Sequence, residues 1–389
     1  MSKIISVSRR TDIPAFYGEW FVNRLEEGFA GYINPFGGQK YIVSLKPEDV
    51  ICFVFWSKNF EPFIEKLKII EKMGYRFCFN YTITGLPSIF ECNLTDKKYA
   101  INSLKKISRL YSPKHINWRY DPVVISSITD YNFHLKNFED MAFELQGYVE
   151  RCYFSYVTQY GKVKRNFDKF QNEHNAVITD PDIGFKTELA EQMSEIAKQH
   201  GISLFTCCGD YLINANIKKA HCIDGKIIED LFFKDGLPYK KKPTRKECGC
   251  TESTDIGTYD TCPHGCIYCY ANINKIKADA VYRNHDIKSA FLGYSKDLSD
   301  KWIKESSIKD FSEYMNTGKK SEISASIDSL SEDINKIYGD SIEYNDLLYG
   351  YIERYLFPEL LDKQKIIKAI RNNPYKLNEL EDVLALDNL

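Results

Sequence analysis

Short apolar or aromatic runs alternate with amphipathic helical segments through most of the chain, and this alternation limits its possible folds more than any other feature. The runs cover residues 3–8, 50–56, 75–84, 115–118, 151–157 and 203–206, with a seventh, weaker run at residues 256–261. Strands that alternate with helices form parallel βαβ units, and this many units form a closed or partly closed barrel. We therefore predict an α/β fold built on a parallel TIM-like barrel, complete or partial.

The segments between the runs carry helix signals. Asp12 is a candidate N-terminal cap, and Pro14 lies in the first turn of the first segment. Phe16 and Trp20 then follow one turn apart on one face. Gly74 is placed to end the second segment, because glycine is favoured just beyond the end of a helix.

Polar and thiol side chains stand just after several of the apolar runs. In a parallel barrel the carboxyl ends of the strands share one rim, and the active site lies there. Residues far apart in sequence are therefore expected to meet at one mouth, which is the main argument from the residues for an enzyme. These residues are Arg9, Arg10, Thr11 and Asp12 after the first run, Lys58 and Asn59 after the second, Arg119, Tyr120 and Asp121 after the fourth, Cys207 and Cys208 after the sixth, and Cys262, Cys266 and Cys269 after the last.

Composition narrows the class of protein. With 389 residues, 43% hydrophobic and 14% aromatic, the chain is not intrinsically disordered. No apolar run approaches the ~20 residues that span a membrane, and residues 1–5 lack the apolar stretch of a signal peptide. We therefore expect a cytoplasmic protein with no membrane partner. In a reducing cytosol its 12 cysteines are not expected to form disulfides, so metal or redox chemistry is the leading explanation for those that cluster.

The character of the sequence changes near residue 295. Residues 296–389 are charged and lack cysteine, and we predict a helical C-terminal domain there, whose apolar stripe packs on the barrel or contacts a protein partner. Residues 1–295 are predicted to form the barrel, with a cysteine-rich region at 205–252 and a second cysteine loop at 261–272.

That second loop places Cys262, Cys266 and Cys269 at spacings of three and two intervening residues. Three thiolates can hold a [4Fe–4S] cluster and leave one iron without a protein ligand. The amino and carboxylate groups of S-adenosylmethionine (SAM) can chelate such an iron. Structural zinc is the rival, and spacing alone does not decide between the two metals.

The string from Cys262 to Ala271 resembles the cluster loop of the radical SAM superfamily, above all its spore-photoproduct-lyase-like branch, where Cys-x-x-x-Cys-x-Tyr-Cys-Tyr-Ala is usual. Residues 1–295 also resemble an uncharacterised bacterial family, domain of unknown function 1848. The matching strings are Ser8-Arg9-Arg10-Thr11-Asp12-Ile13-Pro14, Asn34-Pro35-Phe36, Phe55-Trp56-Ser57-Lys58-Asn59, Trp118-Arg119-Tyr120-Asp121-Pro122, Cys248-Gly249-Cys250 and Asp255-Ile256-Gly257.

The resemblance implies an enzyme that cleaves SAM reductively at a [4Fe–4S] cluster to a 5′-deoxyadenosyl radical. It also implies a reductant such as flavodoxin or ferredoxin, and it points to nucleic acid as a substrate class, with a peptide or small metabolite as the runner-up. The alternative is a binding module for nucleic acid or protein that is stapled by zinc or an iron–sulfur cluster and carries out no turnover.

The order of the motifs departs from the superfamily, because the cluster loop normally follows the first barrel strand and here follows the last. A circular permutation accounts for this if residues 256–261 lie beside residues 3–8 in the sheet. The resemblance then places Arg10 and Asp12 near the amino group and ribose of SAM, Lys58 near its carboxylate, and Tyr268 near its adenine. Asp12 has a second reading, as a helix cap with no other duty.

A second group of cysteines lies upstream of the loop. Cys207, Cys222, Cys248 and Cys250 are the predicted ligands of a second [4Fe–4S] cluster or of zinc, with Cys208 in reserve.

Three further side chains complete the set of candidates. Arg119 and Asp121 are the candidate catalytic pair at the rim, where they would bind substrate or SAM; a structural salt bridge is the competing interpretation. His264 is expected beside the cluster or facing solvent.

Overall fold

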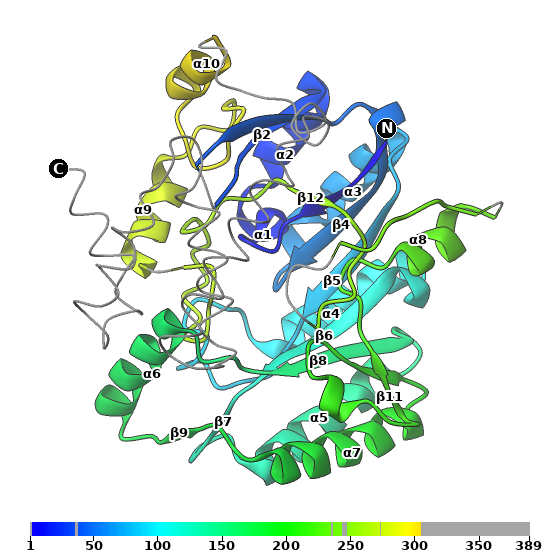
Figure 1. Ribbon diagram of the computed structural model, residues 1–389, viewed down its shortest axis with the longest axis vertical. Helices are drawn as coiled ribbons and strands as arrows, with labels where there is room; N and C mark the ends of the chain where they lie inside the picture. Colours follow the sequence, from blue (N-terminus) through cyan, green and yellow to red (C-terminus); the bar gives the residue numbers. More distant parts are fainter. Residues whose placement is uncertain (1, 36–37, 235, 243–246, 273, 305–389) are drawn as a thin grey trace, which may run out of the picture. The chain divides into compact units, whose positions relative to one another are not determined.

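The computed structural model describes residues 2–35, 38–234, 236–242, 247–272 and 274–304 (Figure 1). The chain divides into two compact units, Met1–Tyr32 with Val43–Lys301 and Ile33–Ile42 with Trp302–Leu389. In the second unit the Lys40 ammonium lies 4.6 Å from the centre of the Trp302 ring. Most of the predicted C-terminal domain, from residue 305 onward, lies outside the described residues. Among the helices that are described, none has the length and apolar character needed to cross a bilayer.

Eight parallel strands form the main sheet of the first unit, in the order β11-β10-β8-β6-β5-β4-β1-β12. Two short pairs lie outside it, β2 with β3 and β7 with β9. The strands are β1 Lys3–Val7, β2 Phe29–Ile33, β3 Lys40–Ser44, β4 Val50–Ser57, β5 Phe77–Thr82, β6 Ile116–Val123, β7 Ile125–Ser126, β8 Arg151–Tyr156, β9 Ile178–Thr179, β10 Ser203–Thr206, β11 Ile217–Lys219 and β12 Thr254–Asp255.

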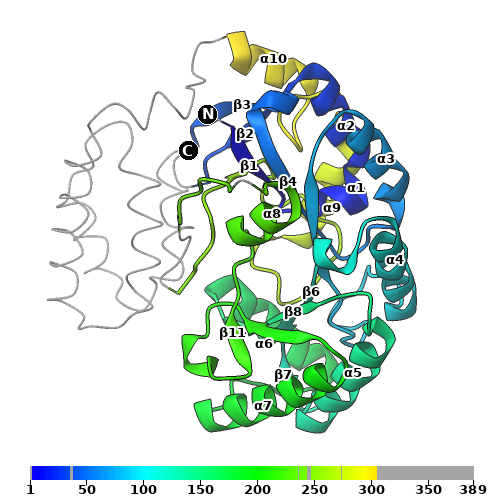
Figure 2. The ribbon, with the colours of Figure 1, turned by 90° about the vertical axis from the view of Figure 1, so that its right-hand side faces the viewer.

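The helices α2, α3, α4, α5 and α7 lie in one arc along the outer side of this sheet (Figure 2). Asp12 caps the first helix as predicted, since its carboxylate accepts a hydrogen bond from the backbone N–H of Ala15 at 3.0 Å. The helices are α1 Ile13–Phe16, α2 Gly18–Glu27, α3 Ile64–Lys72, α4 Lys97–Leu110, α5 Tyr131–Leu145, α6 Gly161–His174, α7 Ile183–Gln199, α8 Gly225–Phe232, α9 Lys275–Asn284 and α10 Lys296–Lys304.

An aromatic layer joins the outer face of the sheet to its helices. Phe53 and Phe55 of β4 lie edge-on to Phe21 of α2, with ring centroids 5.1 and 5.5 Å apart. Phe63 closes the same cluster against Phe55 at 5.0 Å. All four rings are fully buried, and burial of each is worth about 1.5–3 kcal/mol.

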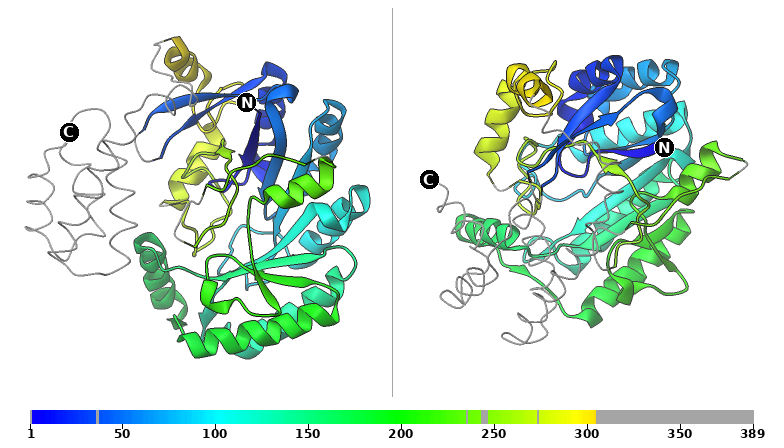
Figure 3. Two further views of the ribbon diagram at one scale, coloured as in Figure 1. Left: turned by 45° about the vertical axis from the view of Figure 1, so that its right-hand side comes forward. Right: turned by 45° about the horizontal axis from the view of Figure 1, so that its top comes forward.

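The opposite face of the same strands has a different character. Cys52, Val54 and Cys78 alternate with the phenylalanines of β4 and β5, because successive side chains of a strand point to opposite faces. Together with Ile4 of β1 they form a separate buried cluster. Helix α8 covers this inner face through Ile228, on the side that the arc of outer helices leaves free (Figures 2 and 3).

Strand β6 is longer than predicted, and this corrects the placement of the candidate catalytic pair. Trp118 and Tyr120 pack on Phe138 of helix α5, with ring centroids 5.1 and 5.2 Å away. The alternation therefore turns Arg119 and Asp121 to the inner face, within the strand and not after it.

The sheet is open between its edge strands β11 and β12, and no strand pairing among the described residues closes it into a complete barrel. β12 pairs in parallel with β1, Ile5 opposite Thr254 and Ser6 opposite Asp255, so the last strand does lie beside the first. The predicted bounds of that last strand, residues 256–261, were wrong. The chain leaves the sheet at Gly257, where an added Cβ would lie 1.9 Å from the Ser8 hydroxyl oxygen.

A single carboxylate holds the junction of β1 and β12. The Ser6 hydroxyl donates to Asp255 Oδ2 at 2.7 Å and the Ser8 hydroxyl to Oδ1 at 2.6 Å. The backbone N–H groups of Arg9 and Gly257 donate to the same carboxylate at 2.8 and 3.0 Å. Asp255 therefore sets the path of both chain segments where they leave the sheet.

We predict that Asp255→Asn destabilises the protein by about 1–3 kcal/mol at neutral pH, because hydrogen bonds to a buried charged acceptor are lost. Burial alone would raise the pKa of Asp255, but Arg10 and Arg9 lower it below its ordinary value. The carboxylate thus stabilises the fold above about pH 4, the pKa of an unfolded aspartate, and this contribution disappears as the pH falls further. Urea unfolding at pH 7 and at acid pH checks this, and an equal difference from wild type at both would contradict it.

Candidate functional site

The cysteines at 262, 266 and 269 lie on a loop that closes on itself. The backbone N–H of Asp260 donates to the Ala271 carbonyl at 3.0 Å, and the Asn272 amide donates to the Cys262 carbonyl at 2.5 Å. Within the loop, the backbone N–H of Cys269 donates to the Cys266 carbonyl at 3.3 Å. The three cysteines are thus carried by one folded segment.

The loop is seated on elements from the first third of the chain. The Tyr17 hydroxyl donates to the Thr261 carbonyl at 2.5 Å, and the Asn93 amide to the Pro263 carbonyl at 2.7 Å. Residues 90–93, which follow β5, make a second contact with the loop: the Ile267 N–H donates to the Phe90 carbonyl at 3.0 Å.

The three thiols interact with one another. Burial raises the pKa of each, that of Cys266 to about 12. Charge on Cys269 raises the pKa of Cys262 and of Cys266 further, so the sulfur atoms lie within electrostatic reach of one another. Thiols whose pKa is raised in this way are stable as thiolates only beside a strong positive charge, which a bound metal supplies.

Asp12 links this loop to the segments that follow β1 and β4. Its Oδ2 accepts from His264 Nε2 at 2.7 Å and from the Lys58 backbone N–H at 2.8 Å, while Oδ1 caps helix α1. His264 is buried, which excludes the second of its two expected positions, facing solvent, and leaves the first, beside the cysteines. Its Nδ1 is buried and has no hydrogen-bond partner among the residues that the structure describes.

Lys58, Glu91 and Tyr268 form a second contact between the loop and the rim. Lys58 Nζ lies 2.7 Å from Glu91 Oε1 and 2.8 Å from the Tyr268 hydroxyl, which also donates to Glu91. Thr84 adds a hydrogen bond to the same oxygen at 2.8 Å. Burial would lower the pKa of Lys58, but the Glu91 carboxylate raises it above its usual value, so the ammonium stays charged.

Arg10 lies at the β1–β12 junction. Its Nη1 donates to the Gly257 carbonyl at 3.3 Å, its guanidinium carbon is 5.5 Å from the centre of the Tyr259 ring, and its Nε lies 4.0 Å from Asp255. The structure therefore places Arg10 beside the segment that leads into the cysteine loop.

Arg119 and Asp121 form a buried ion pair, and Ser155 donates a hydrogen bond to the same carboxylate. The guanidinium of Arg119 lies 5.0 Å from the centre of the Trp56 ring. Its Nη1 also donates to the sulfur of Cys222 at 3.0 Å. The candidate catalytic pair is thus coupled to the upstream cysteines.

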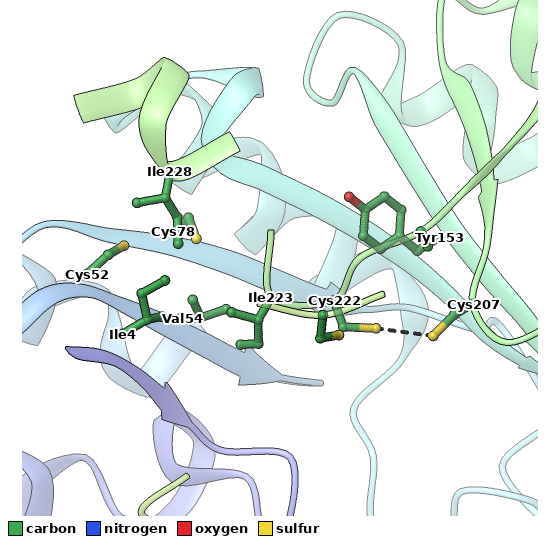
Figure 4. Close-up of a cluster of buried hydrophobic side chains, with 11 residues drawn as sticks. Ile4, Cys52, Val54, Cys78, Tyr153, Cys207, Cys222, Ile223 and Ile228 are labelled. Carbon is green, nitrogen blue, oxygen red and sulfur yellow. Dashed lines mark hydrogen bonds between the residues drawn. The ribbon is translucent and has the colours of Figure 1, made fainter. Parts of the chain in front are cut away.

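The upstream cysteines lie in one buried cluster. Cys207 and Cys222 have their sulfur atoms 3.2 Å apart (Figure 4). Cys222 also contacts Cys250, which contacts Cys248, and Cys208 contacts Cys207. Hydrogen bonds from Cys207 and Cys250 hold the pKa of Cys222 well below its usual value.

Both cysteine groups offer soft sulfur donors, the ligand type of iron–sulfur clusters and of zinc. As they stand, no group of three or more His, Cys, Asp or Glu side chains in the described part of the chain is spaced to surround a metal ion. The donor chemistry fits a metal, and ligand binding would draw the sulfur atoms around it. Two surface hollows, of about 500 and 540 Å³, are lined by other residues, along α1, α2 and α9 and along α4 and α5.

A family profile described as domain of unknown function DUF1848 matches residues 4–271. The chain belongs to this family. The match runs from β1 through the cysteine loop and so includes all the proposed ligand cysteines. A search of curated proteins found no match. Among solved structures, a crystal structure of D-hydantoinase matches with 10% identity and a TM-score of 0.25, over 53% of this chain and 40% of that one, which is too weak to carry an argument.

Two residues of this DUF1848 site were missed from the sequence. Asp255 was quoted only as part of a motif, and Glu91 was not singled out. Neither follows a strand in the way the rim residues do: Asp255 ends the two-residue strand β12, and Glu91 lies in the long connection between β5 and α4. Charged residues in the longer rim loops were the signal that could have found Glu91.

We predict that Arg119→Met lowers the free energy of unfolding by about 3–5 kcal/mol, because it leaves the Asp121 carboxylate buried without its cation. Arg119→Lys keeps the positive charge but cannot contact Asp121 and Cys222 at the same time as the guanidinium does. We therefore expect a smaller loss of unfolding free energy for this variant. Denaturant unfolding of both variants measures the difference. Two variants as stable as the wild type would show that the pair does not support the fold.

Proposed function

We propose that this DUF1848 protein is a radical SAM enzyme with a circularly permuted, partial barrel. One observation carries the proposal: β12 lies beside β1, so the cysteine loop meets Asp12 and Lys58, which come from the other end of the chain. A separate cysteine module on the surface would not make these contacts. The order of the elements around the mouth is then that of the unpermuted superfamily.

Cys262, Cys266 and Cys269 are the proposed ligands of the [4Fe–4S] cluster. When bound, a reduced cluster supplies the electron that cleaves SAM to methionine and the 5′-deoxyadenosyl radical. The chain contributes the shielding: Cys266 and Tyr268 are buried, and the loop is sealed against residues 90–93.

Lys58 is suited to receive the carboxylate of SAM. Its ammonium has three donors, and in the described part of the chain two of them are engaged, with Glu91 and with Tyr268. The remaining donor is available to an incoming carboxylate. Asp12, held by Lys58 and His264, presents a negative charge for the amino group, with Arg10 nearby and Tyr268 on the adenine side.

Arg119 and Asp121 are the proposed substrate-facing pair on the inner face of β6. Arg119, like Arg9, Arg10 and Lys58, is paired with a carboxylate. The choice of nucleic acid as the substrate class therefore rests on the resemblance to the spore-photoproduct-lyase-like branch. A flavodoxin or ferredoxin is the proposed source of electrons.

His264 supports one alternative, a zinc-stapled binding module without turnover. Its Nε2 is oriented by the Asp12 carboxylate, and its unpartnered Nδ1 is the kind of atom that completes a Cys₃His zinc site. Metal analysis separates the two: about one zinc ion and no iron at this loop favours the module, and about four irons favours the enzyme.

We predict that replacing Cys262, Cys266 and Cys269 together by Ala abolishes the reductive cleavage of SAM, because the ligands of the cluster are gone. The assay is chromatography of 5′-deoxyadenosine after anaerobic incubation with dithionite. Cys92→Ala is the matched control: its thiol lies 3.5 Å from the Gly265 carbonyl of the same loop but is not a proposed ligand, so cleavage should persist. Cleavage by the triple variant would refute the ligand assignment.

We predict that Asp12→Ala weakens SAM binding about tenfold, equivalent to about 1.4 kcal/mol, while iron content stays unchanged. The change also removes a helix cap worth about 1 kcal/mol. Asp130→Ala controls for this, because Asp130 caps α5 through the Phe133 N–H at 2.8 Å and lies on a different helix. Equilibrium dialysis with labelled SAM measures the affinity. An equal loss of SAM affinity in the two variants would show that Asp12 acts only as a helix cap.

A further inference from the structure

The five upstream cysteines come from three segments that are separate in sequence. Cys207 and Cys208 follow β10, Cys222 follows β11, and Cys248 and Cys250 precede β12. All five belong to one packed side-chain cluster, in which the sulfur atoms of Cys207 and Cys222 lie 3.2 Å apart. A cluster assembled from three segments in this way is a property of the fold and not of one motif.

The cluster stands where the sheet is open. β11 and β12 are the two edge strands, and the segments that leave β11 and enter β12 meet beside the thiols. The Thr251 N–H donates to the Ile223 carbonyl at 2.9 Å, and the Gly225 N–H donates to the Thr251 hydroxyl at 2.9 Å. Asn80, from β5 in the middle of the sheet, donates to the Cys222 carbonyl at 2.9 Å.

The surroundings of the cluster are those of a negatively charged group. Arg119 donates to the Cys222 sulfur at 3.0 Å. The Arg119 side chain is itself buried. A buried guanidinium is costly beside neutral groups, whereas metal-bound thiolates carry the negative charge that offsets it.

We propose that Cys207, Cys222, Cys248 and Cys250 bind a metal centre through four thiolates, and that this centre joins the two edges of the open sheet. The inference stands without the proposed SAM chemistry, because it uses a different set of ligands. Both a [4Fe–4S] cluster and Zn²⁺ accept four thiolates. Cys208 is not assigned as a ligand, because four thiolates already complete either kind of centre.

The first test measures metal in the variant that lacks Cys262, Cys266 and Cys269, so that any metal left belongs to the second site. Anaerobically purified full-length protein is expected to retain about four irons or about one zinc ion per chain, and elemental analysis separates these sources. Adding Cys222→Ser should remove that metal almost completely. Adding Cys78→Ala, a buried thiol of the same inner cluster, should leave it in place, as should Cys208→Ala.

Several outcomes would overturn the proposal: a triple variant without iron or zinc, metal retained after Cys222→Ser, metal lost after Cys208→Ala, or a Cys207–Cys222 disulfide in place of metal. SAM cleavage by the triple variant would count against the proposed function only.

The second test needs no substitution. Hydrogen exchange is compared in wild-type protein before and after removal of metal with a chelator. Amides of β11 and of residues 248–255 are expected to exchange at least about tenfold faster without metal, because local opening then becomes easier. Amides of β4 and β5 in the centre of the sheet serve as the internal control. Unchanged exchange at both edges would overturn the joining role.

Discussion

The pairing of β12 with β1, held by the Asp255 carboxylate, is the constraint on which the rest of this site depends. It gathers donors from both strands onto two oxygen atoms, and it leaves no room for a side chain at Gly257. Because parallel strands lie about 4.8 Å apart, the segments that leave these two strands must run close together. Asp12 consequently meets His264 across more than two hundred residues of sequence.

The two faces of the sheet carry different kinds of side chain. The outer face is aromatic and packs under the arc of helices, as the cluster of Phe21, Phe53 and Phe55 illustrates. The inner face carries thiols, polar groups and the Arg119–Asp121 pair. Ligands that neutralise the charges on this inner face would add to its stability.

Two cysteine groups border the same mouth, and cations stand between them. Charge on the upstream thiols raises the pKa of Arg9. The Arg9 carbonyl also accepts a hydrogen bond from the Tyr270 hydroxyl of the cysteine loop at 2.8 Å. Charge on Cys266 and charge on Asp121 both raise the pKa of Lys58. The electrostatics of the two groups are therefore linked through side chains that belong to neither, and a change of charge at one would be felt at the other.

The sequence by itself determined the parallel α/β class, the strands β1, β4, β5, β8 and β10 to within a few residues, the Asp12 cap and the grouping of the cysteines. These follow from local signals, namely hydrophobic period, capping chemistry and short spacings. The tertiary structure decided the rest. It decided where the short edge strands lie and that Arg119 and Asp121 point to the inner face. It also decided that His264 is buried and that Glu91 contacts Lys58 and Tyr268. Those features depend on which strand lies beside which, and contacts between distant segments leave no periodic trace in the chain.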